Sequence, residues 1–101
     1  MTNCTISDNN ATYDGGGLFI GWATLTMTNC TISENTATSF GGALQIEIAN
    51  VTMTDCTISQ NTANTHNGGG LWIDQVSLVT MASCTVTANA AGSVSGSPSN
   101  Y

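Results

Sequence analysis

The chain has 101 residues, enough for one small domain, and it contains no lysine or arginine. Its six carboxylates give a formal net charge of −6. A chain without cations cannot neutralise phosphate groups, so nucleic acid and anionic lipid are poor partners. No apolar run approaches the roughly 18 residues of a membrane span, and the first residues lack the basic and apolar regions of a signal peptide. We therefore expect no nucleic-acid binding and no membrane insertion by this segment.

The sequence MTNCTIS at positions 1–7 returns unchanged at 27–33, and the repeat that it reveals runs along most of the chain. Each unit contains a glycine-rich segment, namely GGGLFI (15–20), GGALQI (41–46) or GGGLWI (68–73). Three further columns recur at fixed places in the unit: Cys4, Cys30, Cys56 and Cys84; Met1, Met27, Met53 and Met81; Asn9, Asn35, Asn61 and Asn89. The cysteines are spaced by 26, 26 and 28 residues, which defines a unit of about 26 residues.

Apolar residues alternate within each unit, as in Leu44 and Ile46, then Val51 and Met53, then Cys56 and Ile58. Period two and many β-branched residues predict three short strands separated by turns. Such a unit cannot cover its own apolar side chains, so neighbouring units must stack. The sequence therefore predicts an all-β fold, a parallel β-helix (solenoid) with three short strands per coil and three to four coils over residues 1–90. Crossovers between parallel strands are almost always right-handed, which predicts a right-handed helix.

The recurring columns have structural roles in this stack. We expect the cysteine, methionine, leucine and isoleucine ladders to fill the interior. The asparagine ladder should lie at a corner, where asparagine tolerates left-handed backbone and its amide can bond the coils above and below. The paired glycines should mark a corner where backbones approach closely or φ is positive.

The two ends of the chain depart from the full repeat. Met1 aligns with Met27, so the first unit begins halfway round a coil. Residues 91–101 are small and polar, typical of a flexible tail. We expect a fragment of a longer solenoid, because natural solenoids protect their terminal strands. The alternative is a complete small protein that associates end to end.

Few residues offer chemistry. The cysteine column lacks a Cys-x-x-Cys pair, so packing as small apolar groups is expected rather than a metal or redox site, although neighbouring cysteines could form a strained disulfide. His66 is a loop residue with no second histidine. Asp8 and Glu34 share a column, but calcium needs six to eight oxygens. The sequence predicts no catalytic residue, no metal site and no cofactor.

The aromatic residues give a candidate binding site. If Leu and Ile of the glycine-rich strands point inward, Phe19, Gln45 and Trp72 point outward in one column, flanked by Glu47 and Asp74. Exposed aromatic rings beside carboxylates can stack on sugar rings or anchor a protein. Alternatively, a neighbouring domain or the side chains of Trp22 and Tyr13 cover this column.

Threonine fills many of the remaining outward positions. On the strand after the cysteine the outward residues include Thr5, Thr31, Thr57 and Thr85, and on the strand before it Thr26, Thr52 and Thr80. The grid is similar to the surfaces of ice-binding solenoids. The simpler explanation is that threonine is the polar residue with good β-propensity, so any solvent-facing strand favours it.

Several motifs also carry a family resemblance. GGAL (41–44) and the tetrapeptides ISDN (6–9), ISEN (32–35), ISQN (58–61) and VTAN (86–89) are similar to the GGA[ILV] and FxxN repeats of bacterial polymorphic outer-membrane proteins. Here Ile or Val replaces the Phe, and GGG replaces GGA in two of three units. More broadly, residues 1–90 resemble the right-handed β-helix passenger domains of autotransporters.

This resemblance implies an extracellular or bacterial cell-surface location and adhesion to a glycan or a host or cell-surface protein, with further coils in a longer parent. It also argues against an enzyme, because pectate lyases of similar fold use an arginine or lysine base and this chain has neither. We therefore expect a structural and interaction module for adhesion or ligand display. The alternatives are a carbohydrate-active or carbohydrate-binding β-helix, or an ice-binding solenoid.

Overall fold

The computed structural model describes residues 1–66 and 68–91. Fourteen short strands and no helix are present among these residues. The strands are β1 (Thr5–Ser7), β2 (Asn10–Ala11), β3 (Leu18–Gly21), β4 (Thr24–Thr28), β5 (Thr31–Ser33), β6 (Thr36–Ala37), β7 (Leu44–Glu47), β8 (Asn50–Thr54), β9 (Thr57–Ser59), β10 (Thr62–Ala63), β11 (Leu71–Ile73), β12 (Leu78–Ala82), β13 (Thr85–Thr87) and β14 (Ala90–Ala91). The described residues therefore contain no helix that could cross a membrane.

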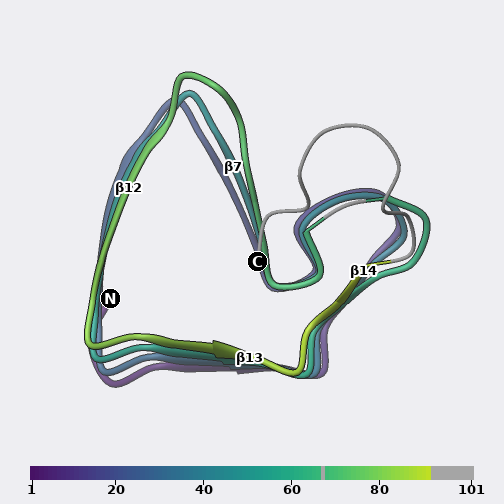
Figure 1. Cartoon of the computed structure of the whole chain (residues 1–101), viewed down its shortest axis with the longest axis horizontal. Coiled ribbons are helices and arrows are strands. Elements are labelled where there is room, and N and C mark those ends of the chain that lie inside the picture. The colour runs from purple at the N-terminus through teal and green to yellow at the C-terminus, as the bar shows by residue number, and fades with distance from the viewer. Residues whose placement is uncertain (67, 92–101) are drawn as a thin grey trace.

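The strands form four parallel sheets in which each strand pairs with its equivalents in the neighbouring coils. The orders are β1-β5-β9-β13, β2-β6-β10-β14, β3-β7-β11 and β4-β8-β12. The register follows the sequence repeat, so that Ile32 pairs with Ile6 and Ile58, and Met53 pairs with Met27 and Met81. Viewed down the shortest axis, the coils lie over one another along nearly the same path (Figure 1). The predicted parallel β-helix is confirmed.

The number of strands per coil differs from the prediction. Each full coil has a fourth strand of two residues directly after the ladder asparagine, such as β6 and β10. These dipeptides pair in register across four coils, from β2 to β14. A two-residue strand is too short to show alternation, so the sequence pattern placed a turn there and the prediction of three strands was wrong. Ala91, which the sequence assigns to the tail, ends β14, and the rest of that tail lies outside the described residues.

The core contains the predicted ladders. Met27, Met53, Cys30 and Cys56 are almost completely buried. The cysteine and methionine side chains of the outer coils pack against this core and are partly buried, except that Met1 is exposed. All four cysteines are free thiols, and each donates a hydrogen bond to the carbonyl oxygen two residues earlier, as Cys56 does to Thr54 at 3.4 Å. The column therefore packs as small apolar groups.

The asparagine ladder joins consecutive coils through side-chain amides. Asn35 donates from Nδ2 to Oδ1 of Asn61 at 3.0 Å and to the carbonyl oxygen of Ile6 in the preceding coil. Its own Oδ1 accepts two hydrogen bonds from Asn9, one from the backbone N–H and one from Nδ2, both at 3.0 Å. The predicted bonding to both neighbouring coils is confirmed.

The left-handed conformation lies one residue earlier than predicted. Positive φ falls on the residue before each ladder asparagine, namely Asp8, Glu34, Gln60 and Ala88, with values between 55° and 59°. A left-handed residue there turns the chain so that the asparagine side chain points inward. Asp8 and Glu34 thus occupy exposed corner positions.

The paired glycines show both of the predicted properties. The first of each pair, Gly15, Gly41 or Gly68, has φ between 63° and 73°. The second approaches the next coil closely, since a Cβ on Gly42 would lie 2.2 Å from the carbonyl oxygen of Gly69. Only glycine allows the coils to stack this closely at the start of β7.

Candidate functional site: an apolar corner

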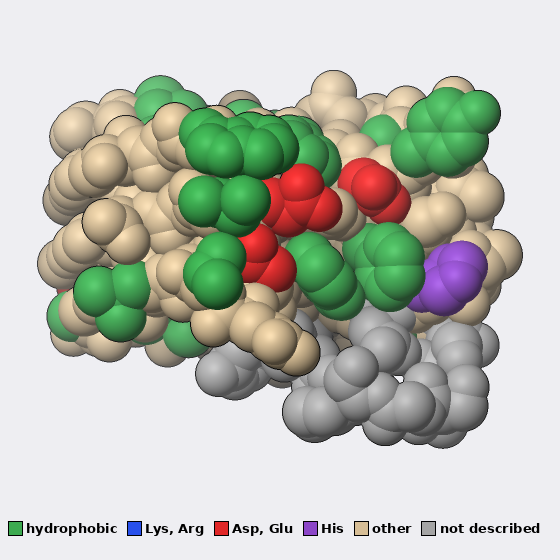
Figure 2. Space-filling view, turned by 90° about the horizontal axis from the view of Figure 1, so that it is seen from above, with side chains coloured by type: hydrophobic (Ala, Val, Ile, Leu, Met, Phe, Trp, Pro, Cys, Tyr) green, Lys and Arg blue, Asp and Glu red, His purple; other side chains and the backbone are tan. Residues whose placement is uncertain are grey.

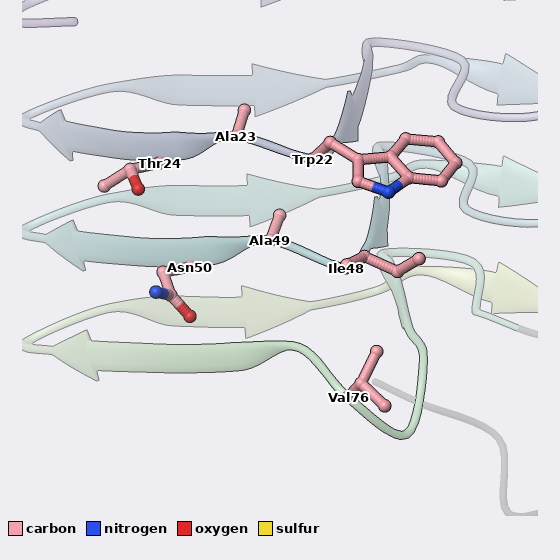
Figure 3. Close-up of a pocket in the computed structure, with 7 residues that line it drawn as sticks. All are labelled: Trp22, Ala23, Thr24, Ile48, Ala49, Asn50 and Val76. Atoms are coloured by element: carbon pink, nitrogen blue, oxygen red, sulfur yellow. The ribbon is translucent and has the colours of Figure 1, made fainter.

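Three large apolar side chains project from the corner between the β3-β7-β11 sheet and the β4-β8-β12 sheet. They are Trp22, Ile48 and Val76, one from each coil, and their exposed fractions are 74%, 46% and 69%. Figure 3 shows them in a row along the stacking direction. We call these three residues the apolar corner. They border an open groove of about 440 Å³, whose other lining residues are Ala23, Thr24, Ala49 and Asn50.

Two of these residues have strained backbone. Trp22 and Ile48 both have φ of 49°. A left-handed conformation costs a residue with a Cβ roughly 1–2 kcal/mol, and it is least suitable for a β-branched residue such as Ile. Other left-handed corners of this chain carry residues that tolerate it, such as Asn3, Asn29 and Asp55. The corner therefore keeps exposed apolar side chains at positions where asparagine or glycine would be more stable.

The turn of the third coil at this corner is longer than the equivalent turn of the second coil. Ile46 and Val51 are five positions apart, whereas their partners Ile73 and Val79 are six apart, so this turn has one more residue. Asp74 begins the turn, and its Oδ2 accepts a hydrogen bond of 2.8 Å from the backbone N–H of Ile48.

Ser77 completes the turn. Its backbone N–H donates to Oδ1 of Asp74 at 2.8 Å, and its Oγ accepts from the backbone N–H of Ala49 at 3.0 Å. A side-chain carboxylate and hydroxyl thus provide the acceptors for the corner of the preceding coil. In the first coil, by contrast, the N–H of Trp22 donates to the backbone carbonyl of Glu47.

Hydrogen bonds from the turn and from the preceding coil affect the pKa of the Asp74 carboxylate. Desolvation raises the pKa of Asp74, but hydrogen bonds from the Ser77 hydroxyl and from the N–H groups of Ile48, Ser77 and Val76 outweigh it and lower the pKa below the ordinary value. The N–H groups of Ile48, Val76 and Ser77 donate to the two carboxylate oxygens at 2.8–3.3 Å. Asp74 therefore contributes to the stability of the corner.

The predicted aromatic column exists but is not a continuous exposed strip. Phe19, Gln45 and Trp72 pair in register, as expected. Phe19 is 50% exposed, whereas Gln45 is only 2% exposed and donates from Nε2 to Oε1 of Glu47 at 3.0 Å. Oε1 of Gln45 is buried without a hydrogen-bond partner among the described residues.

Trp72 belongs to a separate aromatic cluster. Its ring centroid lies 5.2 Å from that of Phe40, which lies 4.6 Å from the His66 ring. Thr65 Oγ1 lies 2.8 Å from Nδ1 of His66. Of the predicted site residues, Glu47 and Asp74 therefore adjoin the apolar corner, and Phe19 lies beside Gly21, which precedes Trp22.

The sequence pattern does not assign Ile48 and Val76 to a site, and it suggests Trp22 only as a cover for the aromatic column. A signal was present, because all three are bulky apolar residues in the turn where the alternation breaks. Figure 2 shows hydrophobic side chains gathered beside the acidic ones and the histidine on one face of the molecule. Among the described residues, no three His, Cys, Asp or Glu side chains are grouped closely enough to hold a metal ion.

The predicted threonine grid has the expected register. Thr26, Thr52 and Thr80 pair across β4, β8 and β12, and all three are exposed. The neighbouring column contains Thr24, Asn50 and Leu78. The column closest to the apolar corner is therefore mixed in character.

The comparisons with known proteins identify the fold family. No curated protein and no solved structure matches the chain. A family model described as "right handed beta helix region" matches residues 1–101, the whole sequence. The match agrees with the parallel coils, the in-register ladders and the all-β architecture. The chain therefore belongs to the right-handed β-helix family.

Proposed function

We propose that this β-helix module displays a binding surface, and that the apolar corner is the part of it that contacts the partner. The observation that carries this proposal is that Trp22 and Ile48 are exposed and also have left-handed backbone. Both features reduce stability, and strain of this kind typically persists where a function requires it. Contiguous exposed apolar side chains are typical of interaction sites.

Display is the mechanism that the stack supports. Parallel coils repeat at about 4.8 Å, so each corner residue lies at a fixed distance from its equivalents in the next coil. Backbone ladders on both sides of the corner hold these positions, as in the hydrogen bond of 3.0 Å from the N–H of Asn50 to the carbonyl of Ala23. A partner thus meets a preorganised surface and loses little free energy to ordering it.

The resemblance to polymorphic outer-membrane and autotransporter passenger repeats supports a finer proposal. In it, the module is part of a bacterial adhesin with further coils, located at the cell surface or secreted. Its partner is a glycan or a host or cell-surface protein. The proposed role is binding rather than catalysis, because the sequence supplies no cationic base for lyase chemistry.

Two substitutions test the proposal with a matched control. Trp22 and Tyr13 are both aromatic and both 74% exposed, but only Trp22 lies at the apolar corner. Immobilised wild-type protein, Trp22→Ala and Tyr13→Ala should be compared for binding to bacterial and host cells and to glycan and protein arrays. We expect Trp22→Ala to lose at least about tenfold in affinity, typical of an aromatic anchor, and Tyr13→Ala to bind normally. Equal binding by all three proteins would refute the assignment.

A second candidate function, ice binding, is favoured by one observation, the exposed in-register column of Thr26, Thr52 and Thr80. Thermal hysteresis of the purified chain tests it. A freezing point that depends only on solute concentration would exclude this function, whereas hysteresis that is lost in Thr52→Tyr would support it.

A further inference from the structure

We infer that the partner of the apolar corner is an extended protein segment that carries both apolar side chains and a lysine or arginine. This inference rests on the proposed function, and it names the chemistry of the partner. Three features of the corner support it: the composition of the groove, the position of Glu47, and the charge of the whole chain.

Most of the side chains that line the groove are apolar. Trp22, Ile48 and Val76 line it together with two alanines, and only Thr24 and Asn50 add polar side chains. A sugar is held by several convergent hydrogen-bonding groups, and both oxygens of Asp74 already accept backbone N–H groups of the corner. Apolar side chains of a polypeptide match this lining better. Three coils at about 4.8 Å provide a row about 10 Å long, which an extended segment of three or four residues covers.

Glu47 supplies an acidic group at the edge of the groove. It directly precedes Ile48, and its backbone carbonyl accepts the N–H of Trp22 at 3.1 Å. Its carboxylate is only partly buried, and one of its oxygens, Oε1, accepts from Gln45. Because that bond comes from a neutral amide, the negative charge of Glu47 is not balanced by it.

Aromatic residues lie close to Gly21, the residue that pairs with Glu47. Gly21 pairs with Glu47 across β3 and β7, and a Cβ on Gly21 would lie 3.1 Å from the Phe19 ring. The Phe19 ring therefore lies beside Gly21, while Trp22 follows Gly21 in the chain. A cationic side chain above Gly21 could meet the Glu47 carboxylate and an aromatic face together, which is a favourable environment for lysine or arginine.

The negative charge of the chain disfavours a second copy of the chain or an anionic molecule as the partner. The sequence contains six carboxylates and no lysine or arginine. A second copy of the chain or an anionic partner would therefore be repelled, whereas a cationic segment would be attracted.

An NMR titration of the full chain tests this inference. The probes are a capped Val-Lys-Val-Lys-Val peptide, its Gln and Glu analogues, and neutral maltohexaose. We expect the Lys peptide to shift the Glu47 and Ile48 amides and to bind about two- to fivefold more tightly than the Gln peptide, the effect of one exposed ion pair. The Glu peptide should bind least, and added salt should remove the difference.

Two charge variants provide the matched comparison. Glu47→Gln keeps an acceptor for Gln45 and should abolish the preference for Lys over Gln. Glu34→Gln removes the same charge from an exposed corner elsewhere and should keep that preference. If the preference is absent in the wild type, or if both variants reduce it equally, the inference is wrong. Tighter binding of maltohexaose at the corner would also overturn it.

The same titration distinguishes a failure of this inference from a failure of the proposed function. If the preference for Lys is absent but Trp22→Ala still weakens the binding of a neutral peptide or of maltohexaose, the apolar corner remains the binding surface and only the cationic assignment is lost. If no probe shifts the corner amides, the inference is overturned. If probes bind but Trp22→Ala has no effect on any of them, both the inference and the proposed function are overturned.

Discussion

The carboxylate of Asp74 accepts a hydrogen bond of 2.8 Å from the backbone N–H of Ile48 in the preceding coil. A side chain of one repeat thus bonds a left-handed corner of its neighbour. This relationship joins the irregular turn of the third coil to the exposed apolar surface of the second. The longer turn of the third coil therefore lies next to a residue with strained backbone.

The Asp74 carboxylate should make stability depend on pH. Its pKa is lower in the folded chain than in the unfolded chain, so its contribution is present above the unfolded value of about 3.9 and is lost as pH falls through the folded value. Asp74→Asn should lower the free energy of unfolding at pH 7 and flatten its decrease between pH 5 and pH 2. Urea unfolding at a series of pH values measures both effects. The same acid-side slope in both proteins would contradict this role.

Relief of strain should stabilise the corner. Asparagine adopts left-handed backbone more easily than isoleucine, so Ile48→Asn should raise the free energy of unfolding by about 1 kcal/mol. Leu78→Asn is the control, because Leu78 is also exposed but lies in β12 without positive φ. We expect a higher melting temperature by about 4–8 °C for Ile48→Asn alone. If the Ile48→Asn protein is more stable and still binds partners as well as the wild type, the strained backbone of Ile48 is not needed for binding.

Close stacking at the glycine corner should not tolerate a methyl group. In Gly42→Ala the new Cβ would meet backbone atoms of Gly69 and Thr62 at 2.2–2.6 Å, and neither can move without shifting a coil. We expect a loss of about 3 kcal/mol or more. Gly21→Ala should be mild, because its closest contact is the Phe19 ring, a side chain that can rotate. Thermal unfolding followed by circular dichroism distinguishes the two, and similar melting temperatures would be inconsistent with the stacking.

The buried amide ladder should be essential at its centre and less so at its edge. Asn61→Ala removes three donated hydrogen bonds and leaves the N–H and the amide of Asn35 without their acceptor. Each buried polar group left unpaired costs about 1–3 kcal/mol. Asn9→Ala should cost much less, because Asn9 is exposed. Chemical denaturation measures both, and equal losses would argue against an internal ladder.

Much of this fold could be predicted because the sequence repeats. A column such as Cys30 and Cys56 fixes coil length, register and interior position together, since a slip by one residue would turn every side chain to the other face. The two-residue strands could not be predicted, because Thr36 and Ala37 show no alternation of their own. Their strand character comes only from pairing with the next coil.

Less of the candidate site than of the fold could be predicted from the sequence. Register placed Phe19, Gln45 and Trp72 in one column, but whether each is exposed depends on neighbours from distant parts of the coil. Phe40, for example, packs against Trp72 from the preceding coil. Likewise the N–H of Ile48 is bonded by Asp74, 26 residues later, so no local pattern contains this contact.

The central claim is that stacked coils bring Trp22, Ile48 and Val76 together as one surface. A NOESY spectrum of methyl-labelled protein tests it most directly. We predict cross-peaks from the Ile48 methyl groups to the Trp22 ring and to the Val76 methyl groups, together with cross-peaks between Met27 and Met53 in the core. Core cross-peaks without any between Ile48 and its two neighbours would contradict the apolar corner, and the absence of both sets would contradict the stack itself.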